Sequence, residues 1–314
     1  HCHNLHGNYF NLSLLQQMSL EKPVVWTLHD MWAITGHCSH SFECQRWQTG
    51  CGHCPHLDTY PRLSWDNTTY LWHRKKQIYK NSKLTIIVPC KWLKNKLKRS
   101  ILNDQNIILI HNGIDTTIFK PYNKLESRKL LHLPTNKKVI LFMAHHGLNN
   151  LWKGGNHVAK LIHDYKNNSD ILFVCLGADP GINISLPNVF FRPIIPKLSE
   201  LAKYYNAADI LLFPSKAETH PLTILEALSC GLPIVSFNVG GIPEIILHKV
   251  NGFLVENQSY SQLLNGLQFL LSLSKEKLRK MSQLNRKKIS KSYSLKKMSN
   301  QYLNLYQKVS QYDK

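Results

Sequence analysis

Residues 210–227 read ILLFPSKAETHPLTILEA. The first four form a short, continuous apolar run, which predicts a buried strand from Ile210 to Phe213. A helix is predicted to follow, with Thr219 or His220 as its N-cap and Pro221 in its first turn. The stretch therefore predicts a strand–loop–helix unit, which is the building block of a parallel α/β sheet.

Apolar runs of the same kind recur along the chain, with longer helical patterns between them. Two series of strands are predicted. They are Pro23–Thr27, Leu84–Val88 and Ile107–Ile110 in the first third, and then Val139–Met143, Ile171–Leu176, Asn188–Phe191, Ile210–Phe213, Ile234–Phe237 and Gly252–Val255. Continuous apolar runs are typical of parallel strands that helices cover on both faces. The predicted fold class is therefore α/β.

The interval between the two series is a candidate domain junction. Asn112-Gly113 and a polar segment that runs to Lys138 lie there, and 314 residues are enough for two domains with a core each. We therefore expect an N-terminal domain over residues 1–113 and a C-terminal domain over 114–294. A final helix over 295–314 has apolar residues at three- and four-residue spacing, so one of its faces must pack on a core.

The chain is strongly basic, with 39 Lys and Arg against 19 Asp and Glu and a formal net charge of +20. This excess predicts an anionic partner: nucleic acid, anionic lipid or a phosphorylated substrate. Five cations from Lys91 to Arg99 are interleaved with Trp92, Leu93 and Leu97. The pattern is typical of a basic amphipathic helix in peripheral contact with an anionic membrane, and equally of a solvated helix face. No run of eighteen apolar residues is available to span a bilayer.

The first seven residues carry neither the basic nor the apolar region of a signal peptide, which predicts a cytoplasmic protein with reduced thiols. Four of the eight cysteines, Cys38, Cys44, Cys51 and Cys54, have the spacing C-x5-C-x6-C-x2-C. Four thiolates can close a structural zinc site, although the first two spacings are longer than the usual chelating pairs. Zinc, free thiols and disulfides stay open as states of this loop.

Two carboxylates bracket the start of the helix expected after Phe213. Glu218 precedes the helix, and Glu226 lies about two turns inside it on the face of Leu222. The first free N–H groups, near Leu222 and Thr223, point the positive end of the helix dipole at any bound phosphate. Open α/β sheets bind ligands at the carboxyl ends of their strands, so this unit suits a diphosphate with hydroxyl groups on either side. Taken alone, the two acids also fit a capping Glu and a surface Glu.

The order of the surrounding motifs resembles the retaining glycosyltransferases of family 4, whose elements here are Pro214-Ser215, Glu218, Glu226-Ala227, Cys230–Val235, Gly240–Glu244 and Asn251–Val255. The resemblance covers nearly the whole chain. The run from Trp26 to Cys38 is most similar to members that act in bacterial exopolysaccharide or capsule synthesis. It implies a GT-B fold, with two Rossmann-like domains facing a cleft: a partial acceptor-side domain with the Cys-rich loop over residues 1–113, and a nucleotide-sugar donor-binding domain over 114–294. The implied enzyme is a hexosyltransferase that moves a sugar from a UDP- or GDP-sugar to a glycan or lipid-linked acceptor with retention of configuration.

The resemblance also implies roles for single residues on the donor side. Glu226 is implied to hold the ribose hydroxyls and Glu218 the transferred sugar. Lys153 and the backbone of Leu222 and Thr223 are implied to bind the diphosphate. In addition, the junction residue Gly113 is assigned to donor binding.

His29, at the end of a predicted strand, matches a family histidine that faces the transferred sugar, and Asp30 is a candidate orienting neighbour. Without that match, a lone histidine after a strand is more often structural. The chain departs from the family's pattern at two places. Gly147 stands where an Arg is frequent, and Thr219-His220-Pro221 replaces Gly-Phe-Gly, so we expect different phosphate and sugar contacts.

Complete members of the family begin with a further strand, a glycine-rich loop and helices before the position of His1. We therefore expect that the chain lacks the first part of its N-terminal domain and that the final helix crosses back onto this domain. No cofactor is expected for the chemistry. Two alternatives are another GT-B enzyme, such as a nucleotide-sugar epimerase, and a zinc-containing nucleic-acid-binding protein. The second leaves Glu218 and Glu226 unexplained, so no nucleic-acid partner is expected.

Overall fold

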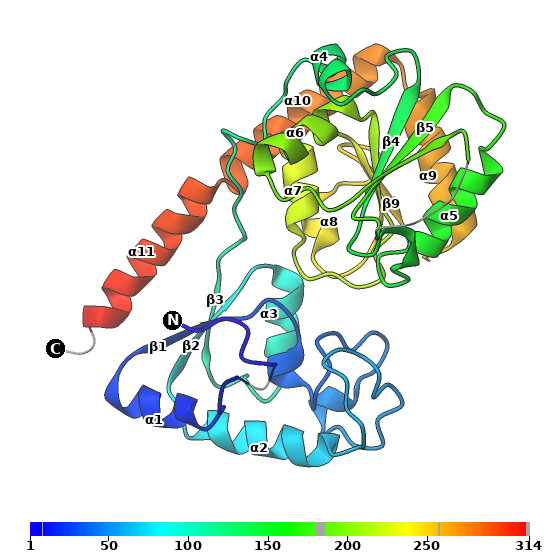
Figure 1. Ribbon diagram of the computed structural model, residues 1–314. Coiled ribbons are helices and arrows are strands. Elements are labelled where there is room, and N and C mark those ends of the chain that lie inside the picture. The colour runs from blue at the N-terminus through cyan, green and yellow to red at the C-terminus, as the bar shows by residue number, and fades with distance from the viewer. Residues whose placement is uncertain (8, 180–185, 257, 312–314) are drawn as a thin grey trace. The chain divides into compact units, whose positions relative to one another are not determined.

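The computed structural model describes residues 1–7, 9–179, 186–256 and 258–311. The chain forms two compact units, which Figure 1 shows with their labelled elements. One unit consists of residues 1–112 together with 298–314, and the other consists of residues 113–297. Each unit contains one parallel sheet. Within the described ranges, no helix has both the length and the apolar character that a bilayer crossing requires.

The sheet of the first unit has the order β1-β2-β3. Its strands are β1 (Val24–Thr27), β2 (Leu84–Val88) and β3 (Asn106–Leu109). One face packs on side chains from α1 (Leu14–Glu21), α2 (Thr68–Lys80) and α3 (Lys91–Leu97). On the other face, Leu305 of α11 (Leu295–Gln311) packs against Val25 and Ile87. The apolar stripe of the last helix is therefore buried on the N-terminal sheet.

The sheet of the second unit has the order β6-β5-β4-β7-β8-β9, and all neighbouring strands are parallel. Its strands are β4 (Lys138–Met143), β5 (Ile171–Leu176), β6 (Val189–Arg192), β7 (Ile210–Phe213), β8 (Ile234–Phe237) and β9 (Phe253–Val255). Counted along the chain, this order is 3-2-1-4-5-6, the doubly wound arrangement of a Rossmann-like domain. The order reverses between β4 and β7, which is the position where such sheets bind ligands.

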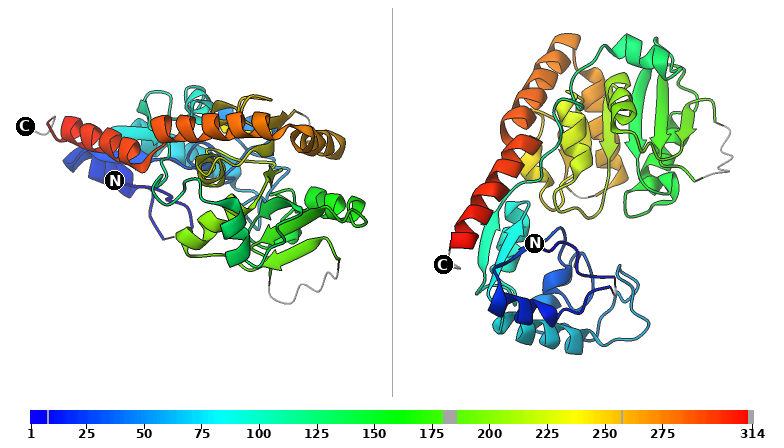
Figure 2. Two further views of the ribbon diagram at one scale, coloured as in Figure 1. Left: turned by 90° about the horizontal axis from the view of Figure 1, so that it is seen from above. Right: turned by 60° about the vertical axis from the view of Figure 1, so that its left-hand side comes forward.

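Helices cover both faces of this sheet (Figures 1 and 2). They are α4 (Lys124–Leu130), α5 (Gly155–Asp164), α6 (Leu198–Ala207), α7 (Leu222–Ser229), α8 (Ile242–Ile245), α9 (Tyr260–Ser272) and α10 (Lys275–Ser292). Leu212 packs in one core with α5 and α9, whereas Leu211 packs in the other with α6 and α7. Both leucines are fully buried. Burial of each side chain stabilises the fold by roughly 1.5–3 kcal/mol. This two-sided burial explains the continuous apolar runs.

Two elements differ from the expectation. The helix after β7 begins at Leu222, and its N-cap is Pro221 rather than Thr219 or His220. Pro221 itself has an extended conformation, with φ −70° and ψ 126°, so the helical residues start one position later than expected. The polar segment before β4 contains the unexpected helix α4, whose N-cap Asn123 accepts a hydrogen bond from the Glu126 N–H. Its capping-box spacing was the signal for this helix.

Candidate active site

A cavity of about 300 Å³ opens in the second unit at the carboxyl ends of its central strands. Met143 and Phe213 line it from the last positions of β4 and β7, and Leu176 from that of β5. Thr223 in the first turn of α7 and Lys153 before α5 also line the cavity. The cavity therefore lies at the switch point of the sheet, where the doubly wound order predicts a ligand.

Two glycines allow the loops around this site to approach one another. Gly154 has φ +76°, and a Cβ there would collide with the Pro214 carbonyl. Gly240 has φ +57°, and a Cβ there would collide with the Glu218 carbonyl. The neighbouring Gly241 N–H donates a 2.9 Å hydrogen bond to the carbonyl of Thr219. The Gly-Gly motif thus holds the loop that carries Glu218.

Lys153 and Glu218 form an ion pair between Nζ and Oε1 beside the cavity. The Glu218 side chain is 11% exposed and that of Lys153 is 38% exposed, so the lysine is the more accessible partner. The ammonium of Lys153 also lies 5.9 Å from the centre of the Phe213 ring, and the backbone N–H of Lys153 donates to Asn150 Oδ1 at 3.0 Å. A cation and a carboxylate are therefore held together beside the end of β7.

The start of α7 lies between this pair and the second acid. Its N-cap, Pro221, offers no side-chain hydrogen bond to the first N–H groups of the helix. Leu222 is exposed, and Thr223 lines the cavity. The positive end of the helix dipole is therefore directed at the cavity wall.

Glu226, one turn further along α7, accepts a 2.7 Å hydrogen bond from the hydroxyl of Tyr205 on α6. Burial raises the pKa of Glu226, and the tyrosine hydroxyl partly offsets the rise. Tyr205 is itself buried, and sequence reasoning missed it because no motif distinguishes it from its neighbour Tyr204. Glu226 does not line the 300 Å³ cavity, so the two acids have different environments.

The remaining donor-side predictions differ in outcome. Gly113 begins the second unit and does not line the cavity. His145, just upstream of the departure at Gly147, does line it. His146 instead places Nδ1 2.8 Å from Asp179 Oδ1. The structure thus offers one histidine at the cavity where the family often has an arginine.

In the first unit, His29 follows the end of β1 and contacts His3. Nδ1 of His3 and Nε2 of His29 are 2.9 Å apart, and the two rings stack with an interplanar angle of 14°. Burial is the larger cause that lowers the pKa of His29, and the charge of His3 lowers it further. The imidazole of His29 is therefore neutral near pH 7. His3 was not predicted as a site residue. The available indication was the spacing of His1 and His3, which places two histidines two residues apart.

Asp30 does not take the expected place beside the His29 imidazole. Its carboxylate accepts the Trp32 N–H at 2.8 Å and lies 3.2 Å from Nε2 of His6. Burial raises the pKa of Asp30, and these two contacts offset only part of the rise. Asp30 therefore holds the segment after β1 and the histidine before α1.

The four clustered cysteines line one cavity of about 20 Å³ as free thiols. Burial raises the pKa of Cys38 and of Cys51 to about 11, so both are protonated at neutral pH. The Sγ of Cys51 accepts the Gly36 N–H at 3.2 Å. In the described part of the chain, no group of three or more His, Cys, Asp or Glu is arranged to hold a metal ion. The residues as arranged do not fit zinc, so the zinc site stays a prediction without geometric support.

A doubly wound donor-type domain, a second Rossmann-like unit and a helix start flanked by two acids define a glycosyltransferase of the GT-B fold. Residues 123–288 match the family described as glycosyl transferases group 1, and residues 1–118 match glycosyltransferase family 4. Because the first match covers more than half of the chain, the protein belongs to the group 1 glycosyl transferases, with a family 4 type N-terminal region.

Known relatives and solved structures agree with this family. The chain is 25% identical to the putative colanic acid biosynthesis glycosyl transferase WcaC of Escherichia coli K12, over 98% of this chain and 76% of the relative. It is 26% identical to the D-inositol 3-phosphate glycosyltransferase of Thermobispora bispora over 53% of this chain, and it spans only 42% of that relative.

Two solved structures share the fold at lower identity. Sucrose-phosphate synthase from Thermosynechococcus elongatus superimposes with a TM-score of 0.69 and 20% identity, over 90% of this chain and 67% of that one. Anabaena Alr3699/HepE, solved in complex with UDP, gives a TM-score of 0.70 and 16% identity, over 95% of this chain and 76% of that one.

Proposed function

We propose that the protein transfers a sugar from a UDP- or GDP-sugar to a glycan or lipid-linked acceptor, with retention of configuration, in polysaccharide biosynthesis. The observation that carries the proposal is the placement of Lys153 and Glu218 beside the start of α7, at the switch point of the second sheet. The similarity to WcaC supports the polysaccharide pathway, and the UDP complex of HepE supports the donor class.

The departing nucleoside diphosphate carries growing negative charge as the bond to the sugar breaks. Lys153 and the N–H groups of Leu222 and Thr223 supply positive charge on this wall, where it stabilises the leaving group. When a diphosphate binds, Lys153 turns from Glu218 to the phosphate. Glu218 is then released to accept hydrogen bonds from hydroxyls of the transferred sugar, each contributing about 1.5–3 kcal/mol.

Glu226 is proposed to accept hydrogen bonds from the ribose hydroxyls. The Tyr205 hydroxyl donates to Oε2, which leaves Oε1 of the same carboxylate for the ligand. Because Tyr205 is fully buried, it holds the carboxylate in one orientation before the ligand arrives. We further propose that the neutral imidazole of His29 contacts the transferred sugar.

The donor assignment is tested by calorimetric titration of the chain with UDP, GDP, ADP and dTDP. Lys153→Met is expected to weaken binding of the preferred nucleotide about ten-fold or more, because a charge-assisted contact is lost. Lys166→Met is the matched control, since Lys166 is exposed on the same unit and does not line the cavity. Equal affinities of the two variants, or no nucleotide binding at all, would show that the donor assignment is wrong.

The reaction class needs a separate measurement. Proton NMR of the product formed from an α-linked donor is expected to show an α-glycoside of the acceptor, as retention requires. Release of an epimerised free sugar without a glycoside would instead favour a nucleotide-sugar epimerase.

A peripheral contact with an anionic membrane is proposed through charge alone. Leu93 and Leu97 of α3 are fully buried in the core of the first unit, so the apolar side of this helix is not available to lipid. Lys98 and Arg99 stay exposed. Co-sedimentation with anionic vesicles, lost at high salt and absent with zwitterionic vesicles, is the expected result. Salt-resistant binding would contradict it.

A further inference from the structure

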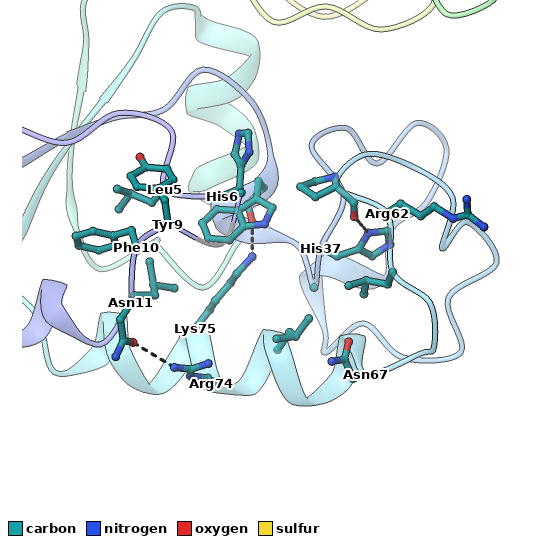
Figure 3. Close-up of a pocket in the computed structure, with 17 residues that line it drawn as sticks. Leu5, His6, Tyr9, Phe10, Asn11, His37, Arg62, Asn67, Arg74 and Lys75 are labelled. Atoms are coloured by element: carbon teal, nitrogen blue, oxygen red, sulfur yellow. Dashed lines mark hydrogen bonds between the residues drawn. The ribbon is translucent and has the colours of Figure 1, made fainter.

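The first unit contains a cavity of about 600 Å³ that the donor chemistry does not use. Its walls come from the segment before α1, the segment after β1, residues 61–67 and the first turns of α2. Figure 3 shows Phe10 and Asn11 on one side and His37 on the other, with Arg74 and Lys75 on α2. A volume of this size is typical of a site for a small molecule or a sugar unit.

The cavity combines aromatic rings with one unused acceptor. Tyr9, Phe10 and Trp32 line it, and Tyr9 is 70% exposed. Asn67, the N-cap of α2, also lines it, and its buried Oδ1 accepts no hydrogen bond from the described residues. Aromatic rings and polar side chains around one cavity suit a sugar, which has both apolar C–H faces and hydroxyls.

The charged side chains that line this cavity in the described part of the chain are basic. None of the described residues that line it is Asp or Glu. Lys75 is committed to the fold, because its Nζ donates to the carbonyls of Trp32 and Thr35 at 2.6 and 3.0 Å. Arg74 is exposed and uses one N–H for Asn11 Oδ1 at 3.3 Å. Neither Arg74 nor the rim residue Arg62 has a carboxylate partner among the described side chains.

The cavity borders the segment after β1, a few residues beyond the candidate catalytic residue His29. Trp32 and His6 both line it, and both contact Asp30, the residue that follows His29. A ligand in the cavity therefore lies against the segment that carries His29. The family resemblance makes this unit the acceptor side of the enzyme, so the acceptor is the substrate expected there.

We propose that this cavity binds the acceptor and that the acceptor is an acidic glycan, with a sugar ring against Tyr9 and Phe10 and a carboxylate or phosphate on Arg74. The inference rests on the proposed function and adds the chemical class of the acceptor. A guanidinium binds either anion through paired N–H groups, so the two sources share one chemistry.

The test uses three probes with one backbone: cellobiose, cellobiouronic acid and cellobiosyl 1-phosphate. Each is titrated calorimetrically into the full chain. At least one acidic probe is expected to bind about ten-fold or more tightly than cellobiose. The acidic probe that binds tighter identifies the source of the anion. Donor nucleotide binding is measured in the same samples, so failure of the donor assignment is seen independently.

Variants connect the preference to the cavity. Arg74→Gln is expected to abolish the preference for the acidic probe and to leave cellobiose unchanged. Tyr9→Ala is expected to weaken all three probes. Arg99→Gln is the matched control, since Arg99 is an exposed arginine of the same unit outside the cavity. Equal binding of all probes, no binding of any probe, or the same loss in Arg99→Gln as in Arg74→Gln would overturn the proposal.

Discussion

Replacing Glu226 by Gln separates the charge of this residue from its place in the fold. Gln has nearly the same volume, and its side-chain oxygen can still accept the hydrogen bond that the Tyr205 hydroxyl donates at 2.7 Å. The fold is therefore expected to persist, and only the negative charge is removed. Any loss of nucleotide affinity then reports on the bond between the carboxylate and the ligand.

The size of the effect follows from the two kinds of hydrogen bond. A bond to a charged acceptor contributes about 1.5–3 kcal/mol and a bond to a neutral one about 0.5–1.5 kcal/mol. The difference of about 1–1.5 kcal/mol corresponds to a five- to thirteen-fold weaker affinity in Glu226→Gln. Glu226→Ala is expected to weaken binding about ten- to a hundred-fold and also to destabilise the unit, because the buried Tyr205 hydroxyl loses its acceptor.

Calorimetric titration with UDP or GDP measures this difference at neutral pH, with Glu276→Gln on the surface of α10 as control. Because burial raises the pKa of Glu226, wild-type affinity is expected to fall with decreasing pH before an ordinary Glu would titrate. The Gln variant should not show this fall. For stability the sign is opposite: an acid with a raised folded pKa contributes a stability that declines as pH rises between its unfolded and folded pKa values. Unchanged affinity and unchanged pH dependence in Glu226→Gln would refute the ribose role.

Three further substitutions test other parts of the structure. Gly240→Ala forces a Cβ against the Glu218 carbonyl at φ +57° and is expected to abolish nucleotide-induced stabilisation in thermal melts; a normal shift would contradict this. Partial burial raises the pKa of Asp209, but Lys124, at 2.8 Å, and Arg128, at 2.6 Å, lower it overall. The contribution of Asp209 to the free energy of unfolding is therefore present at neutral pH and lost as pH falls through the lowered pKa. Asp209→Asn should lower the free energy of unfolding in urea by about 3 kcal/mol at neutral pH and by less in acid. A loss that does not depend on pH would argue against this role. His3→Gln removes the bond to His29 and should raise the pKa of His29 in an NMR titration, whereas an unaltered pKa would show that the pair is not coupled.

Much of the second unit could be predicted from local patterns. Ile171–Leu176, Ile210–Phe213 and Ile234–Phe237 are β5, β7 and β8 residue for residue, because a continuous apolar run is the direct consequence of burial on both faces. The place of Lys153 and Thr223 beside one cavity also followed from motif order.

The basic stretch over α3 shows where a pattern is insufficient. Its apolar residues predict one buried face, but periodicity does not say whether lipid or protein covers that face. The structure buries Leu93 and Leu97 in the core of the first unit. The same ambiguity left the four cysteines open, since spacing along a loop does not set the distances between thiols.

The sequence by itself determined the two parallel sheets, the helix after Phe213 and the family, because strand burial, helix capping and motif order are local properties of the chain. Only the tertiary structure decided which side chains meet. Tyr205 donates a hydrogen bond to Glu226, His3 contacts His29, and His6 contacts Asp30. These contacts join residues from different elements, and the packing that brings them together depends on the whole core rather than on any one stretch.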